Sequence, residues 1–180
     1  MSANDQTMIT ALAQASAAAH PVPDRGHVNT FITDAELQQL LALYLPTDLY
    51  AHLQPYFERM GELAGGAVDD WALEADRNPP TLEMRSRSGK EVQRIVKHPA
   101  YVEMEKVAYQ QFGLAAISHR EDMLGWNGKM PPIVKYALTY LFVQSEFGLC
   151  CPLSMTDSLT RTLKKYGEQK LVEKYLPQLL

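Results

Sequence analysis

Apolar side chains recur every three or four residues along most of this chain, and this spacing predicts a mainly helical fold. The first stripe starts after Thr33, which forms a capping box with Glu36. It consists of Leu37, Leu40, Leu41 and Tyr44. A second stripe starts at Thr47, and Pro55 within it implies a kink or a break. A third predicted helix ends at Asn78-Pro79-Pro80.

One segment departs from the helical pattern. Residues 82–97 alternate loosely between apolar and polar side chains around a Ser-Gly turn, which predicts a short β-hairpin. Positive charge gathers here on Arg85, Arg87, Lys90, Arg94, Lys97 and His98. Such a patch suits the phosphates of a nucleotide, coenzyme A or nucleic acid, or it keeps the edges of an exposed hairpin soluble. We favour the second interpretation, because no aromatic side chains interleave with the basic ones.

The second half returns to helical spacing. His98-Pro99 leads into a helix that we expect to reach residue 116, and a loop rich in Gly and Pro follows it. A long apolar helix is expected over residues 133–149, with Pro152 breaking the chain before a further helix that Gly167 ends. The predicted fold class is all-α: a helical bundle with one possible short hairpin near 82–97 and a helix content well above the usual average.

Size and composition fit one globular domain. The chain has 180 residues, of which 46% are hydrophobic and 21% charged, so it can bury a core without covalent staples. Residues 1–30 are rich first in Ala and Ser and then in Pro and Gly, and we expect a flexible arm there. Residues 31–180 are expected to form the helical domain.

The chain is expected to be cytoplasmic. The most apolar stretch, residues 136–155, is interrupted by Gln144, Ser145 and Glu146, so it does not read as a membrane span. The N-terminal residues lack the basic and apolar regions of a signal peptide. Adjacent cysteines do not form a relaxed disulfide, so Cys150 and Cys151 are interpreted as small core residues in a reducing compartment.

No motif predicts a catalytic or metal centre within the chain. The five histidines lack the spacing of metal ligands, and neither a phosphate-binding glycine loop nor a nucleophile elbow is present. The net charge of −4 disfavours nucleic acid as a partner of the whole chain. We therefore expect no catalytic, cofactor-binding or metal-binding residue here.

The run from Ser154 to Asp157 has two interpretations. Ser154 or Thr156 caps a helix, with Asp157 in its favourable first turn. Alternatively, Met155 and Thr156 line a pocket suited to an acyl chain or another flat ligand. Glu146, in the most apolar predicted helix, either points outward or needs a partner or a raised pKa.

Three short runs near the end of the chain resemble the N-terminal helical domain of the acyl-CoA dehydrogenase flavoproteins. They are Cys151-Pro152-x-x-Met155-Thr156, Lys165-Tyr166-Gly167 and Lys174-Tyr175-Leu176-Pro177-Gln178-Leu179. The first run, with Asn78-Pro79-Pro80, the hairpin and His98-Pro99, is most similar to the branch named for the adaptive response to DNA alkylation.

This resemblance implies a three-part FAD-dependent oxidoreductase acting on acyl-CoA, of which this chain is an N-terminal fragment. The middle β-domain and the C-terminal helical domain, which hold most of the flavin contacts, the catalytic carboxylate and the DNA-binding part, are expected to be absent. Alone, the chain is expected to be inactive and to bind no FAD. The full-length parent is expected to be a homo-oligomer, and Met155 and Thr156 to line its substrate cavity.

Two other functions compete with this one. The chain is a stand-alone helical module that docks a partner through its last helix, or it is a DNA-associated alkylation-response protein that uses the basic hairpin. The sequence leaves both open.

Overall fold

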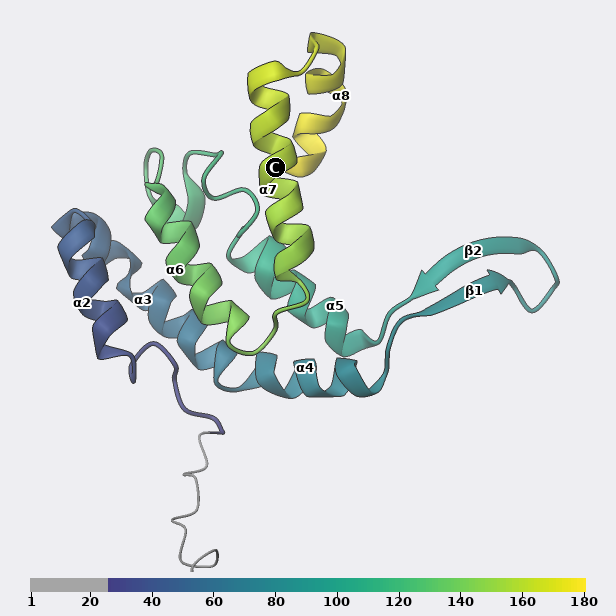
Figure 1. The fold of residues 1–180 in the computed structure, drawn as a ribbon, viewed down its shortest axis with the longest axis horizontal. Coiled ribbons are helices and arrows are strands. Elements are labelled where there is room, and N and C mark those ends of the chain that lie inside the picture. The colour runs from purple at the N-terminus through teal and green to yellow at the C-terminus, as the bar shows by residue number, and fades with distance from the viewer. Residues whose placement is uncertain (1–25) are drawn as a thin grey trace, which may run out of the picture.

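The computed structural model describes residues 26–180 as a helical body from which one hairpin and one helical pair project (Figure 1). Most of the predicted arm therefore lies outside the described residues. The elements are α2 Ala35–Tyr44, α3 Thr47–Ala64, α4 Ala67–Arg77, β1 Thr81–Arg85, β2 Glu91–Val96, α5 Pro99–Glu105, the π-helix η1 Lys106–Gln111, the 3-10 helix η2 Met123–Gly125, α6 Pro132–Val143, α7 Cys150–Tyr166 and α8 Gln169–Leu179. The prediction of a mainly helical fold with one hairpin is confirmed.

The core lies where α3 packs against α6 and where α4 packs against α5 (Figure 1). The predicted apolar stripes supply its side chains. The largest fully buried ones include Phe57, Met60, Met104, Leu138 and Phe142. Burying each such side chain contributes about 1.5–3 kcal/mol, so these contacts between helices distant in the sequence hold the body together.

Helix α2 is capped by Asp34, and the predicted Thr33–Glu36 capping box is wrong. The Asp34 carboxylate accepts from the Leu37 backbone N–H at 2.8 Å. Thr33 instead donates its hydroxyl to the Asn29 carbonyl at 3.1 Å. Asn29 organises a turn just before the helix and engages Thr33 there, so the helix starts one residue later than expected.

Helix α3 runs without a break through Pro55, so the predicted break does not occur there. A proline inside a helix removes the hydrogen bond from its own nitrogen to the carbonyl four residues earlier. That carbonyl belongs to Ala51, which is exposed, so water can bond it instead. The buried residues of α3 lie on both sides of Pro55, so both halves of the helix pack on the core.

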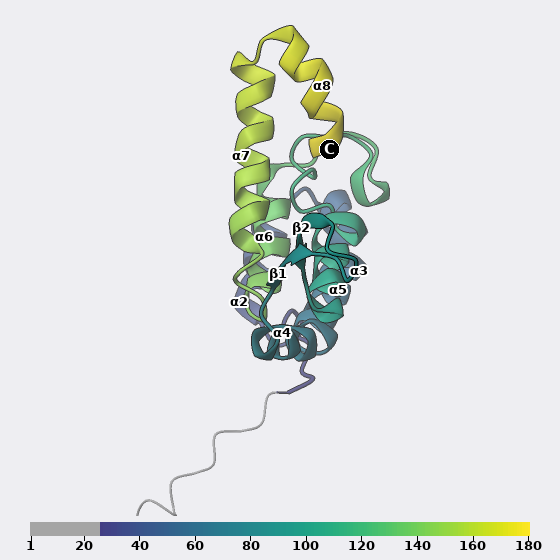
Figure 2. The same cartoon turned by 90° about the vertical axis from the view of Figure 1, so that its right-hand side faces the viewer.

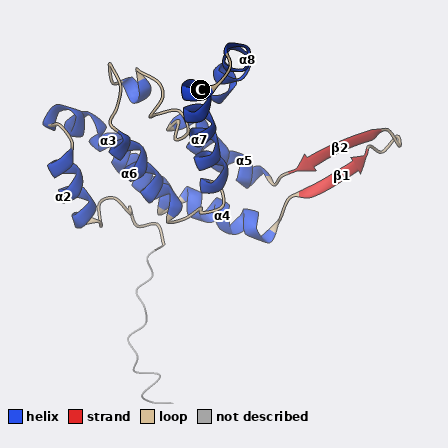
Figure 3. Ribbon diagram, turned by 45° about the horizontal axis from the view of Figure 1, so that its top comes forward, coloured by secondary structure: helices blue, strands red, loops and turns tan. Residues whose placement is uncertain are grey.

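The hairpin is confirmed and projects away from the body between α4 and α5 (Figure 3). Its strands are antiparallel, with Leu82 opposite Ile95 and Glu83 opposite Arg94. Arg94 forms an ion pair with Glu83 at 2.6 Å, and Lys97 forms one with Glu105 at 2.6 Å. Part of the predicted basic patch is thus neutralised by its neighbours.

The helix after His98 is shorter and less regular than predicted. It passes from α5 into η1, and the helical hydrogen bonds end near Phe112 and not at residue 116. Gly113 adopts a left-handed conformation with φ of 58°, which turns the chain out of the helix. π-helical turns are often found at functional sites, and η1 carries Tyr109.

The region around Pro152 corrects two predictions. Helix α6 ends at Val143, and Pro152 lies in the first turn of α7 instead of ending the previous helix. A proline is tolerated there because first-turn N–H groups have no partner within the helix. Ser154 and Thr156 lie inside α7, so neither caps it.

The α6–α7 connection also places Glu146 and the cysteines. The Glu146 carboxylate accepts from the Leu149 backbone N–H at 2.9 Å, so this residue supports the start of α7 from a loop. Cys150 is half-buried against the core, whereas Cys151 is exposed, which contradicts a core role for Cys151.

Helix α7 rises from the body, and α8 turns back to pack along its upper part (Figure 2). Only the lower part of α7 has buried side chains, namely Leu153, Asp157 and Thr160. No helix within residues 26–180 is long and apolar enough to cross a membrane.

Gly61 provides a test of the packing between α3 and the segment before α2. A Cβ atom at Gly61 would collide with the Asn29 side chain and the Phe31 backbone. We expect Gly61→Ala to lower the free energy of unfolding by about 1–3 kcal/mol, as overpacking does. Urea denaturation measures this value. A gain of up to about 1 kcal/mol, which helix propensity alone predicts, would contradict the packing.

Candidate functional site

The two residues predicted to line a substrate pocket lie on neighbouring faces of α7. Met155 is 66% exposed. Thr156 is half-buried, and its side chain opposes the rise in the pKa of Tyr109 in η1. Neither residue is among those that line the three hollows described below, so their role as pocket residues stays a prediction.

Apolar side chains are exposed along α7 and just before it. Besides Met155, Leu159 one turn later is 47% exposed, and Phe147 in the preceding loop is 79% exposed. We call Phe147, Met155 and Leu159 the α7 apolar face. Met155 and Leu159 lie one turn apart on the same side of the helix, and exposed apolar patches mark surfaces that contact a ligand or another protein segment.

The opposite side of α7 is fixed by a buried polar cluster. The Asp157 carboxylate accepts from His119 Nε2 at 2.6 Å through one oxygen and contacts Lys135 Nζ at 2.8 Å through the other. The side chains of His119, Lys135 and Asp157 are 5%, 9% and 9% exposed. This Asp157 cluster joins α7, α6 and the turn that contains His119.

The surroundings set the charges of this cluster. Burial alone would raise the pKa of Asp157, but the hydrogen bonds from Lys135 and His119 outweigh it and lower the pKa below 3.8. Burial lowers the pKa of His119 below 6.5, more than the contact with Asp157 raises it. Arg161 and Lys164 also oppose protonation of His119. At neutral pH the Asp157 carboxylate is therefore ionised and the His119 ring neutral.

The cluster positions α7 and does not itself offer chemistry to a substrate. Its three side chains are almost wholly enclosed, so a substrate cannot reach the carboxylate or the imidazole. Removing the Asp157 carboxylate would leave Lys135 buried without its anion, which would strongly destabilise the fold. Sequence reasoning missed it because His119 lies 38 residues from Asp157. The available signal was that Asp157 shares the apolar face of Leu153 at helical spacing.

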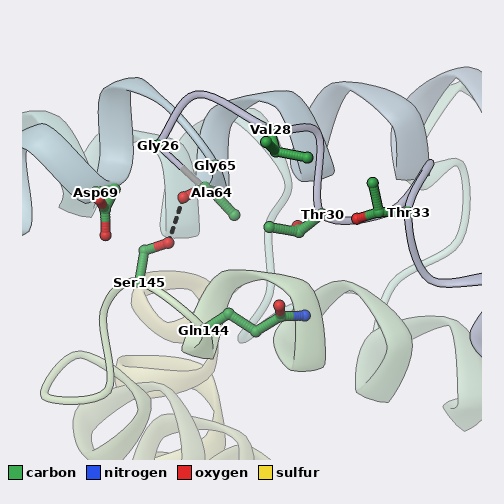
Figure 4. Close-up of a pocket in the computed structure, with 9 residues that line it drawn as sticks. All are labelled: Gly26, Val28, Thr30, Thr33, Ala64, Gly65, Asp69, Gln144 and Ser145. Carbon is green, nitrogen blue, oxygen red and sulfur yellow. Dashed lines mark hydrogen bonds between the residues drawn. The ribbon is translucent and has the colours of Figure 1, made fainter. Parts of the chain in front are cut away.

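A polar cavity lies where residues 26–33 cross the ends of α3 and α6 (Figure 4). Its volume is about 620 Å³. Asp69 is its one charged lining residue, and Ser145 donates its hydroxyl to the Ala64 carbonyl across it. This hydrogen bond ties the loop after α6 to the end of α3.

An apolar groove of about 410 Å³ lies between α2 and α6. Leu40, Tyr44, Tyr136 and Tyr140 line it. Tyr140 donates its hydroxyl to Asp34 at 2.9 Å, which links the two helices across one end of the groove.

Within the part of the chain that the structure describes, no group of three or more His, Cys, Asp or Glu side chains is placed to hold a metal ion. Within residues 26–180, His52, His98 and His119 bond to groups of the fold, and no histidine of this range belongs to such a group.

A family model described as "Adaptive response protein AidB N-terminal domain" matches residues 21–180. A curated relative, "Acyl-CoA dehydrogenase family member 11" of Caenorhabditis elegans, is 22% identical over 154 residues. That match covers 84% of this chain and 24% of the relative, so the chain spans about a quarter of the relative's length.

Two solved structures share the fold. The one titled "Bd2924 apo-form" has a TM-score of 0.74 and 29% identity over 89% of this chain and 31% of that chain. The other, Caenorhabditis elegans ACDH-11 in complex with C11-CoA, has a TM-score of 0.71 and 20% identity. It is matched over 92% of this chain and 29% of that chain.

We expect Asp157→Asn to lower the free energy of unfolding by about 3–5 kcal/mol, because it leaves Lys135 buried without a negative charge. Urea denaturation followed by circular dichroism measures the change. Thr160→Val is the matched control on the same buried face. The Thr160 hydroxyl has no hydrogen-bond partner among residues 26–180. Its removal should therefore lower the free energy of unfolding little, or raise it. Equal stabilities of Asp157→Asn and the wild type would contradict the role of the cluster.

Stability should also depend on pH through His119. Because its folded-state pKa is below 6.5, the unfolded chain binds more protons as the pH falls through 6.5, and stability decreases. The loss from Asp157 follows only below 3.8. Chemical denaturation of the wild type and of His119→Gln between pH 8 and pH 5 separates the contributions. We expect a shallower pH dependence in His119→Gln, and an unchanged slope would contradict the assignment.

Proposed function

Because the chain belongs to the AidB N-terminal domain family, we propose that it supplies one helical wall of the substrate cavity of an acyl-CoA dehydrogenase-like oxidoreductase. The family assignment agrees with the resemblance seen in the sequence. The observation that carries the proposal is the α7 apolar face, exposed on a helix whose other side is fixed by the Asp157 cluster. A rigid helix with an exposed apolar face suits contact with an acyl chain.

The relatives support this choice of ligand. One protein of the same fold was solved in complex with C11-CoA, an acyl thioester. By analogy, Met155 and Leu159 would contact the hydrocarbon chain, and Thr156 would lie at the margin of the wall beside Tyr109. Burial raises the pKa of Tyr109 above 10.0, so its phenol stays protonated and able to donate a hydrogen bond.

The two hollows described above do not suit the flavin of such an enzyme. FAD would accept the hydride when an acyl thioester is oxidised, but the cavity of Figure 4 and the α2–α6 groove do not fit its diphosphate. Their charged lining residues are Asp69, Asp34 and Glu36, all negative. We therefore propose no flavin contact in these two hollows.

The two competing functions have less support. The hairpin and α7 expose apolar residues that a stand-alone helical module would be expected to bury. The DNA-binding alternative relied on the basic hairpin, where Arg94 and Lys97 are already paired with acidic residues.

A chimera tests the proposal. Residues 21–180 would replace the matching segment of the Caenorhabditis elegans relative, and acyl-CoA binding would be measured by calorimetry with long and short acyl chains. We expect Met155→Trp to weaken long-chain binding by about tenfold, because filling the cavity overpacks it. Short-chain binding should change little.

Leu43→Trp is the matched control, because Leu43 is an exposed apolar residue of α2, 74% exposed, on another helix. It should leave both affinities unchanged. Equal effects of the two substitutions, or no effect of Met155→Trp in a chimera with wild-type thermal stability, would contradict the wall.

A further inference from the structure

A third hollow, of about 620 Å³, lies between the start of α3, the segment 118–132 and α7. Its lining includes Tyr44, Ser118, Trp126, Lys129 and Arg161. We call it the Trp126 hollow. It combines aromatic side chains, a hydroxyl group and two cationic side chains, unlike the polar cavity and the apolar groove.

The cations of the Trp126 hollow are available to an anion. None of the ion pairs among residues 26–180 includes Lys129. Arg161 lies 3.6 Å from Asp157, whose charge Lys135 already balances. No acidic residue lines the hollow, although the chain as a whole carries a net charge of −4.

Other charged groups near the hollow reinforce its positive character. Burial, and then the nearby Lys129 ammonium, lower the pKa of Lys164. Lys164 donates to the His119 carbonyl at 2.7 Å. The acidic residues nearest along the chain are Asp48 and Glu121, and Glu121 meets Lys129 through a backbone bridge.

The loop that carries Trp126 and Lys129 is held in a strained conformation. Asp122 and Leu124 have φ of 58° and 51°, values that non-glycine residues seldom adopt. The His52 Nε2–H donates to the Leu124 carbonyl at 2.9 Å, and the His52 and Trp126 rings are 5.3 Å apart. Strain of this kind persists where contacts over-determine a loop, as at binding sites. Trp126 is thus positioned before a ligand arrives.

We propose that the Trp126 hollow binds a nucleoside diphosphate, with the phosphates on Lys129 and Arg161 and the base against Trp126. Two cations match two phosphate groups, and an indole offers a flat surface on which a base can stack. The single concave site favours a small ligand over a nucleic-acid strand, which needs a groove with successive aromatic platforms. The Trp126 hollow shares no residue with the α7 apolar face, so substitutions in the hollow leave the acyl wall unchanged.

Fluorescence titration with ADP tests the site. The chain has two tryptophans, so in the Trp71→Phe variant Trp126 is the one fluorescent indole. We expect saturable quenching that weakens as ionic strength rises. Lys129→Gln and Arg161→Gln should each weaken ADP binding about tenfold, and Arg161→Lys should retain most of the affinity. Calorimetry on the chain with both tryptophans provides a second readout.

The control removes two cations elsewhere, as Arg87→Gln with Lys90→Gln at the hairpin tip, and should bind ADP normally. Absence of saturable binding, or unchanged ADP binding in Lys129→Gln/Arg161→Gln with an unchanged circular dichroism spectrum, would overturn the proposal. If adenosine binds as tightly as ADP, the two cations contribute nothing to binding, which contradicts the proposed phosphate contacts. If inorganic phosphate binds as tightly as ADP, the Trp126 indole contributes nothing, which contradicts the proposed stacking of the base. Tighter binding of a single-stranded oligonucleotide would replace the nucleotide with a nucleic acid.

Discussion

The Asp157 carboxylate, buried between Lys135 and His119, ties together three parts of the chain that lie far apart in the sequence. The apolar core of α3, α4, α5 and α6 forms from stripes that any helical bundle needs. It contacts α7 only at its start, through Cys150 and Leu153, and α7 then rises from the body. Because a buried ion pair tolerates little change in geometry, the cluster defines the angle at which α7 leaves the body.

The proposed role as a cavity wall depends on this fixed helix. The family match covers residues 21–180, and the relatives are three to four times as long as the matched segment. A helix that presents Met155 and Leu159 at a fixed position suits a cavity wall completed by other protein segments. The Trp126 hollow uses Arg161 from the same helix, so the cluster also fixes one side of the proposed nucleotide site.

Local patterns predicted much of the fold and little of the site. The stripes of α2, α3 and α4, the hairpin and the stop at Pro79-Pro80 follow from spacing and turn chemistry, so they could be found without tertiary information. Pro55 and Pro152 were misjudged because the cost of a proline depends on where its nitrogen and its partner carbonyl lie in the fold. The Asp157 cluster and the Trp126 hollow each bring together residues from different segments of the chain. Local sequence patterns do not predict contacts between distant segments.

Hydrogen exchange on the wild type and Asp157→Asn tests most directly whether the cluster fixes α7. The account predicts that amides in the lower part of α7 exchange much faster in the variant. Amides in α3 and α4 should lose only the protection that the lower global stability of the variant accounts for. Two results would contradict the claim that the cluster fixes α7: unchanged protection of the α7 amides, or a loss of protection equal to that in α3 and α4. Either result would mean that the apolar core alone holds α7.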